Sequence, residues 1–558
     1  MAGGFTARPA LPAGGHLNAN IARHLGAMAA AQPETCALKV PRGRASGGRI
    51  DYLALSYREL DAEVAAWQDR LSRAGVKPGD RVLVMVKPGL PLIAAAFALF
   101  RHGAVPVIID PGMGLRAFAS CVARTRPRVL LGIPLAQIVS RVMRKGFASV
   151  EVRIGVSASL TARAIVEAAS PPLPKRRDAA STSTALAAIV FTSGSTGAPK
   201  GVCYEHGMFD AQVRLIRETY GIEPGEVDLP MLPIFALFNP ALGMTTVVPE
   251  IDPRRPAAAD PARIVQAIRQ EEVTNSFGSP TLWRLVAEHC ARTGATLPSL
   301  RRVLCAGAPV PEALWRAAPA FLTRGELHSP YGATEALPVA TVGGRSRLRS
   351  PMGSAIGVPV AGAEVRIIAI TDGPIDHVRD TRPLAASEIG EIIVSGPMVT
   401  RAYDHLPEAT RAAKIADDDG RFWHRMGDCG CRDESGRLWF SGRKAERVQT
   451  DSGTLFTEPC EQPFREHPRA RRCALVGVGA PGAQIPALVA ETRVTGAADA
   501  RALAGELRRI ARENPWTWDL RHFYFHPNFP VDVRHNAKIH RLTLARWAAR
   551  NRPIVAED

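Results

Sequence analysis

The sequence predicts an α/β protein whose first half contains parallel, doubly wound sheets. Ser56-Tyr-Arg-Glu59 has the form of a capping box ahead of an amphipathic helix. A strand pattern at 81–86, a helix pattern at 90–102 and a second strand pattern at 105–110 follow it. A strand, helix and strand in this order join neighbouring parallel strands. With 558 residues, the chain is long enough for one large domain and a smaller one.

The elements can be placed along the chain from their hydrophobic periods. Residues 1–16 are rich in Gly, Pro and Ala and are expected to be disordered, and a helical pattern runs from Leu17 to Ala31. In the helix after Ser56, four apolar residues fall on one face: Leu60, Val64, Trp67 and Leu71. A helix is expected at 208–219. From about residue 365 strand patterns predominate, at 365–370, 391–395 and 438–440.

The turn Gly442-Arg443-Lys444 is interpreted as a domain boundary. We therefore expect a large domain at 17–442 and a small one at 443–558. In the small domain, Gly477-Val-Gly479-Ala-Pro-Gly482 matches a dinucleotide-binding motif, but Pro481 and the apolar run at 487–492 predict a turn and a second strand where that site needs a helix.

Composition limits the classes of function. The chain is 46% hydrophobic and 22% charged, as in ordinary globular proteins, and its formal charge of +17 favours anionic partners. The basic residues are dispersed, so no nucleic-acid site is expected. The nine cysteines lack zinc spacing and are expected to be reduced, which fits a cytoplasmic protein. No signal peptide is evident, and the apolar stretch 89–100 is too short to span a bilayer.

Residues 187–200 carry the most informative motif. The apolar run 187–191 has the pattern of a buried strand. It leads into hydroxyl-bearing residues and glycines, followed by Lys200: Thr192, Ser193, Gly194, Ser195, Thr196 and Gly197. Glycines let backbone N–H groups approach an anion, and hydroxyls and a lysine add donors and charge. We expect a polyphosphate-binding loop rather than a Ser/Gly-rich surface linker. It is not a Walker A loop, because Ala198 and Pro199 separate Gly197 from Lys200.

The string from Val190 to Val202 resembles the phosphate-binding signature of the adenylate-forming superfamily, which includes acyl-CoA synthetases, peptide-synthetase adenylation domains and luciferases. A second segment also resembles that superfamily: Tyr331, Gly332, Ala333, Thr334 and Glu335. The resemblance implies that the Tyr331 ring packs against adenine, that Thr334 bonds the α-phosphate, and that Glu335 and Thr196 hold Mg²⁺. A third stretch resembles the lining of the adenine pocket: Gly307, Ala308 and Pro309.

Three further positions follow from the same resemblance. Gly427-Asp428 resembles the segment whose aspartate accepts the ribose hydroxyls, although Met426 replaces the usual threonine. Arg443 matches an arginine that reaches the ribose or phosphate, and Ala445 occupies the hinge position, where relatives have Asp or Lys. Lys538 matches the adenylation lysine, preceded here by Ala537 instead of glycine.

These segments imply a single reaction. A carboxylate attacks the α-phosphate of MgATP and gives an acyl-adenylate and pyrophosphate. Mg²⁺, Lys200, Arg443 and Lys538 counter the repulsion between the carboxylate and the triphosphate. The resemblance further implies a large N-terminal domain of doubly wound sheets plus a distorted β-barrel, and a small mobile α+β C-terminal domain.

At finer grain, the chain resembles the β-lactone synthetases of long-chain olefin biosynthesis from about residue 17 to its end. Among the particular stretches are Phe235–Gly243, Phe277–Pro280, Trp439–Lys444 and Asp532–Ile539. Such enzymes activate a 2-alkyl-3-hydroxy acid, whose own hydroxyl then displaces AMP and closes a four-membered lactone. Association with other olefin-pathway enzymes is a further expectation. The apolar residues around two loops are expected to line a pocket for long acyl chains: Phe235, Phe238, Asn239, Phe277 and Gly278.

Two alternatives stay open from the residues. The first is a long-chain fatty acyl-CoA ligase or fatty acyl-AMP ligase that passes the adenylate to a thiol. The loop 228–243 has no histidine of the kind often found in acyl-CoA synthetases, and 448–458 lacks their usual Ile-Lys-x-x-Gly string. The second is a non-catalytic scaffold, against which the intact set of charged site residues argues.

Overall fold

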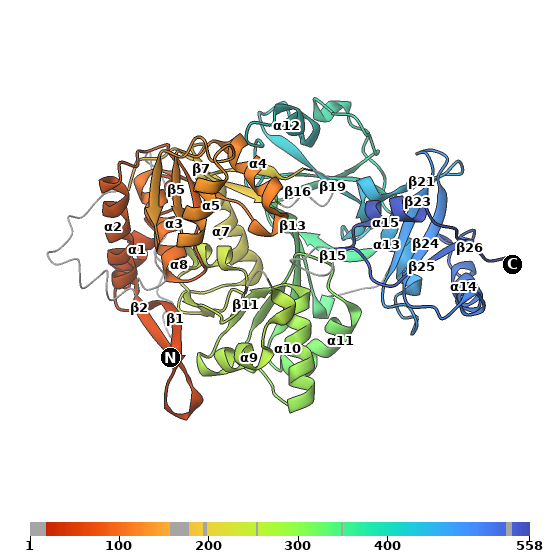
Figure 1. The fold of residues 1–558 in the computed structure, drawn as a ribbon, viewed down its shortest axis with the longest axis horizontal. Coiled ribbons are helices and arrows are strands. Elements are labelled where there is room, and N and C mark those ends of the chain that lie inside the picture. Colours follow the sequence, from red (N-terminus) through yellow and green to blue (C-terminus); the bar gives the residue numbers. More distant parts are fainter. Residues whose placement is uncertain are drawn as a thin grey trace, which may run out of the picture.

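The computed structural model describes residues 18–156, 178–192, 198–252, 255–346, 350–531 and 538–557. The expected disorder of residues 1–16 and the start of the expected helix at Leu17 lie outside these ranges. The protein is a mixed α/β structure: a large N-terminal part of two sheets and their helices, and a smaller C-terminal part with its own sheet (Figure 1).

The first sheet has six strands in the order β6-β5-β3-β4-β7-β8. All neighbours are parallel except β7 and β8. Its strands are β3 (Arg81–Met85), β4 (Val105–Ile108), β5 (Val129–Gly132), β6 (Val152–Gly155), β7 (Leu186–Thr192) and β8 (Lys200–Glu205). The helices connecting or covering them are α1 (Arg23–Ala31), α2 (Tyr57–Arg73), α3 (Leu90–His102), α4 (Leu115–Thr125), α5 (Pro134–Val142) and α7 (His206–Tyr220).

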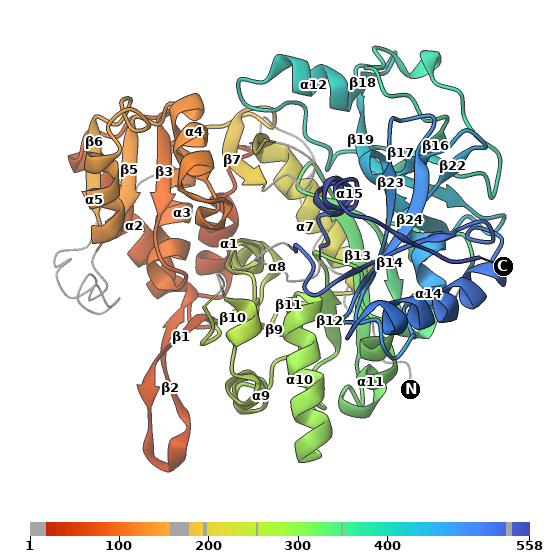
Figure 2. The same ribbon diagram turned by 45° about the vertical axis from the view of Figure 1, so that its right-hand side comes forward.

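Helices cover both faces of this sheet, which confirms the predicted doubly wound architecture. Successive strand residues point to opposite faces: Val82 and Val84 pack with α2 and α3, whereas Leu83 packs with Phe118 of α4. Figure 2 shows the strands between these helices. The predicted helix at 90–102 matches α3, and the predicted strand at 81–86 is one residue longer than β3.

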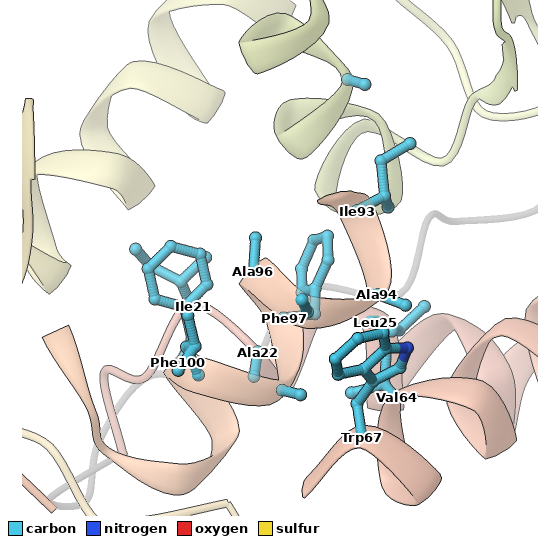
Figure 3. Packing of buried hydrophobic residues seen from close by; sticks show 14 of the residues in the cluster. Ile21, Ala22, Leu25, Val64, Trp67, Ile93, Ala94, Ala96, Phe97 and Phe100 are labelled. Atoms are coloured by element: carbon cyan, nitrogen blue, oxygen red, sulfur yellow. The ribbon is translucent and has the colours of Figure 1, made fainter. Parts of the chain in front are cut away.

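The core beneath α1–α3 is built from the predicted apolar faces (Figure 3). Ile21, Leu25, Trp67 and Phe97 pack together and are at most 4% exposed. The capping box forms: the Ser56 hydroxyl accepts from the Glu59 N–H at 3.2 Å, and the Glu59 carboxylate accepts from the Ser56 N–H at 2.7 Å.

The second sheet has fourteen strands. The portion made of β1, β2 and β9 to β13 is mainly parallel, and the remaining strands are antiparallel. The mainly parallel portion contains β1 (Cys36–Arg44), β2 (Ile50–Ser56), β9 (Val227–Asp228), β10 (Thr245–Val247), β11 (Asn275–Gly278), β12 (Arg302–Cys305) and β13 (Glu326–Ala333). Its helices are α8 (Asn239–Leu242), α9 (Pro261–Gln270), α10 (Pro280–Thr293) and α11 (Glu312–Phe321).

The resemblance implied a distorted β-barrel in the large domain without assigning strands to it; the remaining strands make the antiparallel end of this same sheet. They are β14 (Ala336–Gly343), β15 (Ser354–Pro359), β16 (Glu364–Ile368), β17 (Gly390–Ser395), β18 (Lys414–Ala416), β19 (Phe422–Arg432) and β20 (Leu438–Arg443), with α12 (Pro407–Ala413) beside them.

The C-terminal part begins after β20 and lies to one side of the large part (Figure 1). It contains a two-stranded and a four-stranded sheet. Its elements are β21 (Val448–Gln449), β22 (Thr454–Leu455), α13 (Thr457–Glu461), β23 (Cys473–Val478), β24 (Ile485–Glu491), α14 (Ala497–Arg512), β25 (His522–His526), α15 (Arg541–Ala548) and β26 (Ile554–Val555). β23 and β24 form an antiparallel hairpin, so the Gly-x-Gly-x-x-Gly stretch is a turn between strands, as predicted.

Candidate active site

The predicted phosphate loop joins two antiparallel strands. Thr192 ends β7 and pairs with Lys200 at the start of β8. Five of the predicted loop residues lie outside the described residues: Ser193, Gly194, Ser195, Thr196 and Gly197. A hairpin brings both ends of the loop together, whereas a Walker A loop leads into a helix. The predicted Lys200 therefore stands beside the strand that delivers the loop.

Side chains far away in sequence hold the end of this loop. Arg124 of α4 donates to the Pro199 carbonyl at 2.6 Å, and its guanidinium lies 5.5 Å from the centre of the Phe191 ring. The Lys200 ammonium lies 4.8 Å from the centre of the Tyr403 ring. Sequence reasoning missed Arg124 and Tyr403, because nothing in their local sequence distinguishes them.

The second predicted motif lies at the end of the β13–β14 hairpin. The Tyr331 hydroxyl donates to Asp428 Oδ2 at 2.7 Å, and Arg443 Nη1 lies 2.8 Å from Asp428 Oδ1. Burial raises the pKa of Asp428, while Arg443, Tyr331 and Lys538 lower it. Four residues predicted from separate motifs, 331, 428, 443 and 538, are therefore within electrostatic reach of one another.

The other residues of the 331–335 motif take part in the hairpin backbone and its neighbours. At Gly332 the register shifts, and a Cβ there would lie 2.8 Å from the Ala336 carbonyl oxygen. Ala333 ends β13. The Thr334 carbonyl accepts from the Tyr204 hydroxyl at 2.6 Å, and Glu335 Oε1 accepts from the Tyr403 hydroxyl at 2.8 Å. Tyr403 thus contacts both the predicted metal ligand and the predicted phosphate-binding lysine.

Gly307, Ala308 and Pro309 follow directly after β12. They lie at the carboxyl edge of the parallel strands, which is the edge where ligands bind in open α/β sheets. Gly307 has a φ of +96°, a conformation that favours glycine, and its neighbours are partly or fully exposed. The position fits the predicted lining of a nucleotide pocket.

The predicted acyl-pocket residues form a stack of aromatic rings. The Phe235 and Phe277 ring centres are 3.8 Å apart, those of Phe235 and Phe238 6.1 Å, and those of Phe238 and Phe209 4.8 Å. Phe235 and Phe238 come from the 3₁₀ helix 233–238, and Phe277 comes from β11. At Gly278 a Cβ would lie 2.4 Å from the Met231 methyl group and 2.8 Å from Trp283 Nε1, so a larger residue there would require these side chains to move.

Asn239 lies below this stack and is 1% exposed. Its amide donates to Asp228 at 2.9 Å and to Thr246 at 2.8 Å, and Asn275 donates to Asp228 at 2.7 Å. Burial raises the pKa of Asp228 to about 6, against the effect of the two amides. Asn239 therefore fixes the segment that carries Phe235 and Phe238.

A buried lysine that the sequence analysis did not single out stands behind Glu335. Lys414 is 6% exposed, and its ammonium donates to the Thr400 hydroxyl at 3.1 Å. Thr400 in turn donates to the Glu335 carbonyl through its N–H at 2.9 Å and its hydroxyl at 3.1 Å. Burial lowers the pKa of Lys414 to about 7, while Glu335 raises it.

The predicted hinge position, Ala445, lies between two anchored neighbours. Lys444 donates to the Thr371 carbonyl at 2.6 Å and to Glu391 at 3.1 Å, both in the large part. Glu446 accepts from Arg541 Nη1 at 3.1 Å, in the C-terminal part. The backbone at Ala445 therefore lies between a residue anchored in the large part and a residue anchored in the C-terminal part, and Arg447 adds an ion pair back to Asp372 of the large part at 2.6 Å.

Arg541 stands three residues beyond Lys538. Besides Glu446, it bonds Glu461 with both Nε and Nη2 at 2.7 Å. The side chains of Glu446 and Glu461 are 5% and 2% exposed, and that of Arg541 is 15% exposed. This buried charge cluster ties the segment of Lys538 to the residue after Ala445, a link that sequence reasoning missed.

The donor set around Glu335 fits Mg²⁺ bound together with a nucleotide. No group of three or more His, Cys, Asp or Glu side chains able to hold a metal ion occurs in the described ranges. Mg²⁺ is usually held by one or two carboxylates plus substrate phosphates rather than by an all-protein cage. A single carboxylate at 335 next to a phosphate loop is therefore sufficient. Among the described residues, no helix has the length and apolar character that crossing a membrane requires.

The comparisons with known proteins agree with this geometry. The model of the family described as AMP-binding enzyme matches residues 28–404. An olefin beta-lactone synthetase of Stenotrophomonas maltophilia is 44% identical over 548 residues, which cover 95% of this chain and 98% of that protein. An olefin beta-lactone synthetase of Xanthomonas campestris is 43% identical over 554 residues, covering 96% and 98%.

A solved structure shares the fold over nearly the whole length. The amide bond synthetase of Marinactinospora thermotolerans superposes with a TM-score of 0.76 at 24% identity, covering 95% of this chain and 99% of that one. At 95% of this chain, the match necessarily extends beyond residue 404.

Proposed function

This chain belongs to the AMP-binding enzyme family, and we propose that it is an ATP-dependent β-lactone synthetase. It activates a 2-alkyl-3-hydroxy fatty acid as an acyl-adenylate and then closes it to a β-lactone, releasing pyrophosphate and AMP. The observation that carries the proposal is the likeness to olefin beta-lactone synthetases over 95% of the chain. The grouping of Tyr331, Asp428, Arg443 and Lys538 supports the first half-reaction.

In the first step a carboxylate oxygen of the acid attacks the α-phosphorus of ATP, and the bond to pyrophosphate breaks. Asp428 accepts the ribose hydroxyls, and Arg443 favours the ionised form of Asp428 against the effect of burial. Lys200 and the loop 192–197 bind phosphate oxygens, and Lys538 bridges the acid and the α-phosphate. Glu335 and Thr196 would hold Mg²⁺, which neutralises phosphate charge when it is bound.

In the second step the 3-hydroxyl oxygen of the acyl group attacks the acyl carbonyl carbon. The bond from that carbon to the AMP oxygen breaks, and the hydroxyl proton is released. The ring is strained, but the mixed anhydride is activated and the nucleophile is tethered, so its effective concentration is high. No thiol is required.

The aromatic stack 235/238/277 with Phe209 offers an apolar surface for long alkyl chains. We infer that these rings move apart to admit the substrate. Truncating Phe235 to Ala should lower the KM for acids with longer chains relative to shorter ones, and an unchanged chain-length profile would argue against this placement.

The division at residues 442 and 443 with a hinge at Ala445 belongs to the same proposal. Lys444 and Glu446 are fastened to different parts of the molecule, which supports a pivot between them. The proposal also places the protein in the cytoplasm, among other olefin-pathway enzymes.

A test of adenylation is pyrophosphate exchange by the Lys538→Ala variant. The exchange rate should fall by roughly a hundredfold or more, because the charge between carboxylate and α-phosphate is lost. The parent should form lactone and AMP from the hydroxy acid and MgATP without coenzyme A. AMP release that depends on an added thiol, with plain fatty acids as substrates, would instead identify an acyl-CoA or acyl-AMP ligase.

A further inference from the structure

Helix α5 exposes an apolar stripe to solvent. Leu135, Ile138 and Val142 are 63%, 57% and 77% exposed, and their spacing places them on one helix face. The buried face of α5 carries Ala136, Gln137 and Ser140 instead. Isolated exposed apolar residues are common, but a stripe of large side chains marks an interaction surface.

The first residue of α4, the preceding helix, is a further exposed apolar side chain. Leu115 is 60% exposed. Helix α4 follows β4 and helix α5 follows β5, and both strands run parallel to β3, which lies between them, so both helices begin at the carboxyl edge of the first sheet. Side chains of both helices, such as Phe118 and Val139, pack on one core cluster, which places the helices on the same face of the sheet. In Figure 2, α5 lies at the left edge of the molecule and α4 lies further inward, beside β7; the outer sides of these two helices are called the α4–α5 face.

The same stretch of chain is strongly basic. Residues 111–150 contain seven Lys and Arg and no Asp or Glu. Arg124 and Arg128 are engaged by Pro199 and Asp80 within the fold. The other five are exposed, on α4, on α5 or within three residues of their ends: Arg116, Arg126, Arg141, Arg144 and Lys145.

We propose that the α4–α5 face docks on an anionic lipid bilayer. Large apolar side chains flanked by Lys and Arg are the pattern of an element that lies in a membrane interface, and each basic residue near an anionic leaflet adds attraction. The nine residues of α5 are too few to span a bilayer. A second copy of this chain is disfavoured as the occupant, because a two-fold contact would set two basic faces against each other.

This inference goes beyond the proposed function and does not depend on lactone formation. Docking on a bilayer would place the enzyme where long-chain acids partition. The phosphate loop starts from the same carboxyl edge, at the end of β7, so docking would hold the active-site side of the first sheet near the lipid surface.

The test is co-sedimentation of the full chain with vesicles of phosphatidylcholine, with and without phosphatidylglycerol. We expect binding to the anionic vesicles that weakens with added salt. The triple variant Leu135→Ser/Ile138→Ser/Val142→Ser and the double variant Arg141→Glu/Arg144→Glu should each lower the partition coefficient by about tenfold or more. A control variant with exposed apolar residues elsewhere, Val358→Ser/Ile485→Ser/Trp518→Ser, should bind like the parent.

Thermal midpoints near the parental value would show that the variants fold. The proposal is overturned if the parent does not sediment with anionic vesicles, or if the triple variant binds as the parent does. It is also overturned if light scattering shows that the parent is a dimer and the triple variant a monomer, since the stripe would then be a contact between copies. Equal loss of binding in the control variant would likewise contradict a docking site on α4–α5.

Discussion

Replacing Glu446 with Gln tests whether the buried cluster around Arg541 positions Lys538, the proposed adenylation lysine. The substitution removes one charged contact, the 3.1 Å bond between Glu446 and Arg541, and keeps both 2.7 Å bonds from Arg541 to Glu461. Gln has nearly the same shape, and the remaining Arg541–Glu461 pair is electrically balanced. The variant should therefore fold, which a charge-removing change at Arg541 itself would not guarantee.

The magnitude follows from the type of contact. A buried hydrogen bond between charged groups contributes about 1.5–3 kcal/mol. If that energy holds the segment of Lys538 in the productive orientation, its loss lowers the adenylation rate by roughly 10- to 100-fold. The KM for ATP should change little, because Asp428 and Arg443 are untouched.

The assay is pyrophosphate exchange with saturating acid, together with lactone formation from a synthetic acyl-adenylate that bypasses the first step. Exchange should fall, and conversion of the supplied adenylate should stay near the parental rate. Glu466→Gln serves as the control, since Glu466 pairs with Arg316 at 3.4 Å on the surface and exposed pairs contribute little. A pyrophosphate-exchange rate of Glu446→Gln equal to that of the parent would refute the reasoning. So would the finding that Glu446→Gln lowers the exchange rate by the same factor when Lys538 is already replaced by Ala.

Three further predictions concern buried ionisable groups. Burial raises the pKa of Glu63 from 4.5 to about 7. Its contribution to the free energy of unfolding is therefore complete below pH 4.5 and is lost as the pH rises through 7, where the buried carboxyl must ionise. Glu63→Gln removes the cost of that buried charge, up to roughly 3 kcal/mol, so it should raise the thermal midpoint at pH 8 and should not do so at pH 4. Burial lowers the pKa of Lys414 from 10.5 to about 7, so the free-energy cost of burying its charged form is largest below pH 7. The difference in thermal midpoint between Lys414→Met and the parent should therefore favour the variant more at pH 6 than at pH 9.5. The reverse order would contradict a buried ammonium. Asp428→Asn should raise the KM for ATP by about tenfold or more, as measured by exchange, because its charged contacts with Tyr331 and Arg443 are lost.

Local sequence was sufficient for the elements with strong periodic patterns. The capping box at Ser56 and the apolar helix at 90–102 form where they are predicted, because their signals lie within a single helix. The hairpin at 473–491 was predicted from prolines that exclude a helix, and it forms as expected. Motifs also predicted roles for Tyr331, Asp428, Arg443 and Lys538, and the fold places these four residues near one another although they lie up to about 200 residues apart in the chain; their roles stay predictions.

The supporting residues could not be predicted in this way. Arg124 of α4 and Tyr403 of the segment after β17 contact Pro199 and Lys200 at the end of the predicted phosphate loop, and these contacts depend on sheet order. A lysine at the end of a helical segment is usually exposed. Lys414 is buried because it begins β18, which pairs with β19. The cluster of Arg541 joins three short segments of the C-terminal part, none of which has a distinctive pattern.

The most direct measurement is mass spectrometry of the products from a 2-alkyl-3-hydroxy fatty acid and MgATP, with and without coenzyme A. The account predicts equal amounts of β-lactone and AMP in both reactions, together with one pyrophosphate for each AMP. A product that appears only with coenzyme A and carries it as a thioester would contradict lactone closure. Absence of AMP in both reactions, with an intact fold, would contradict adenylation itself.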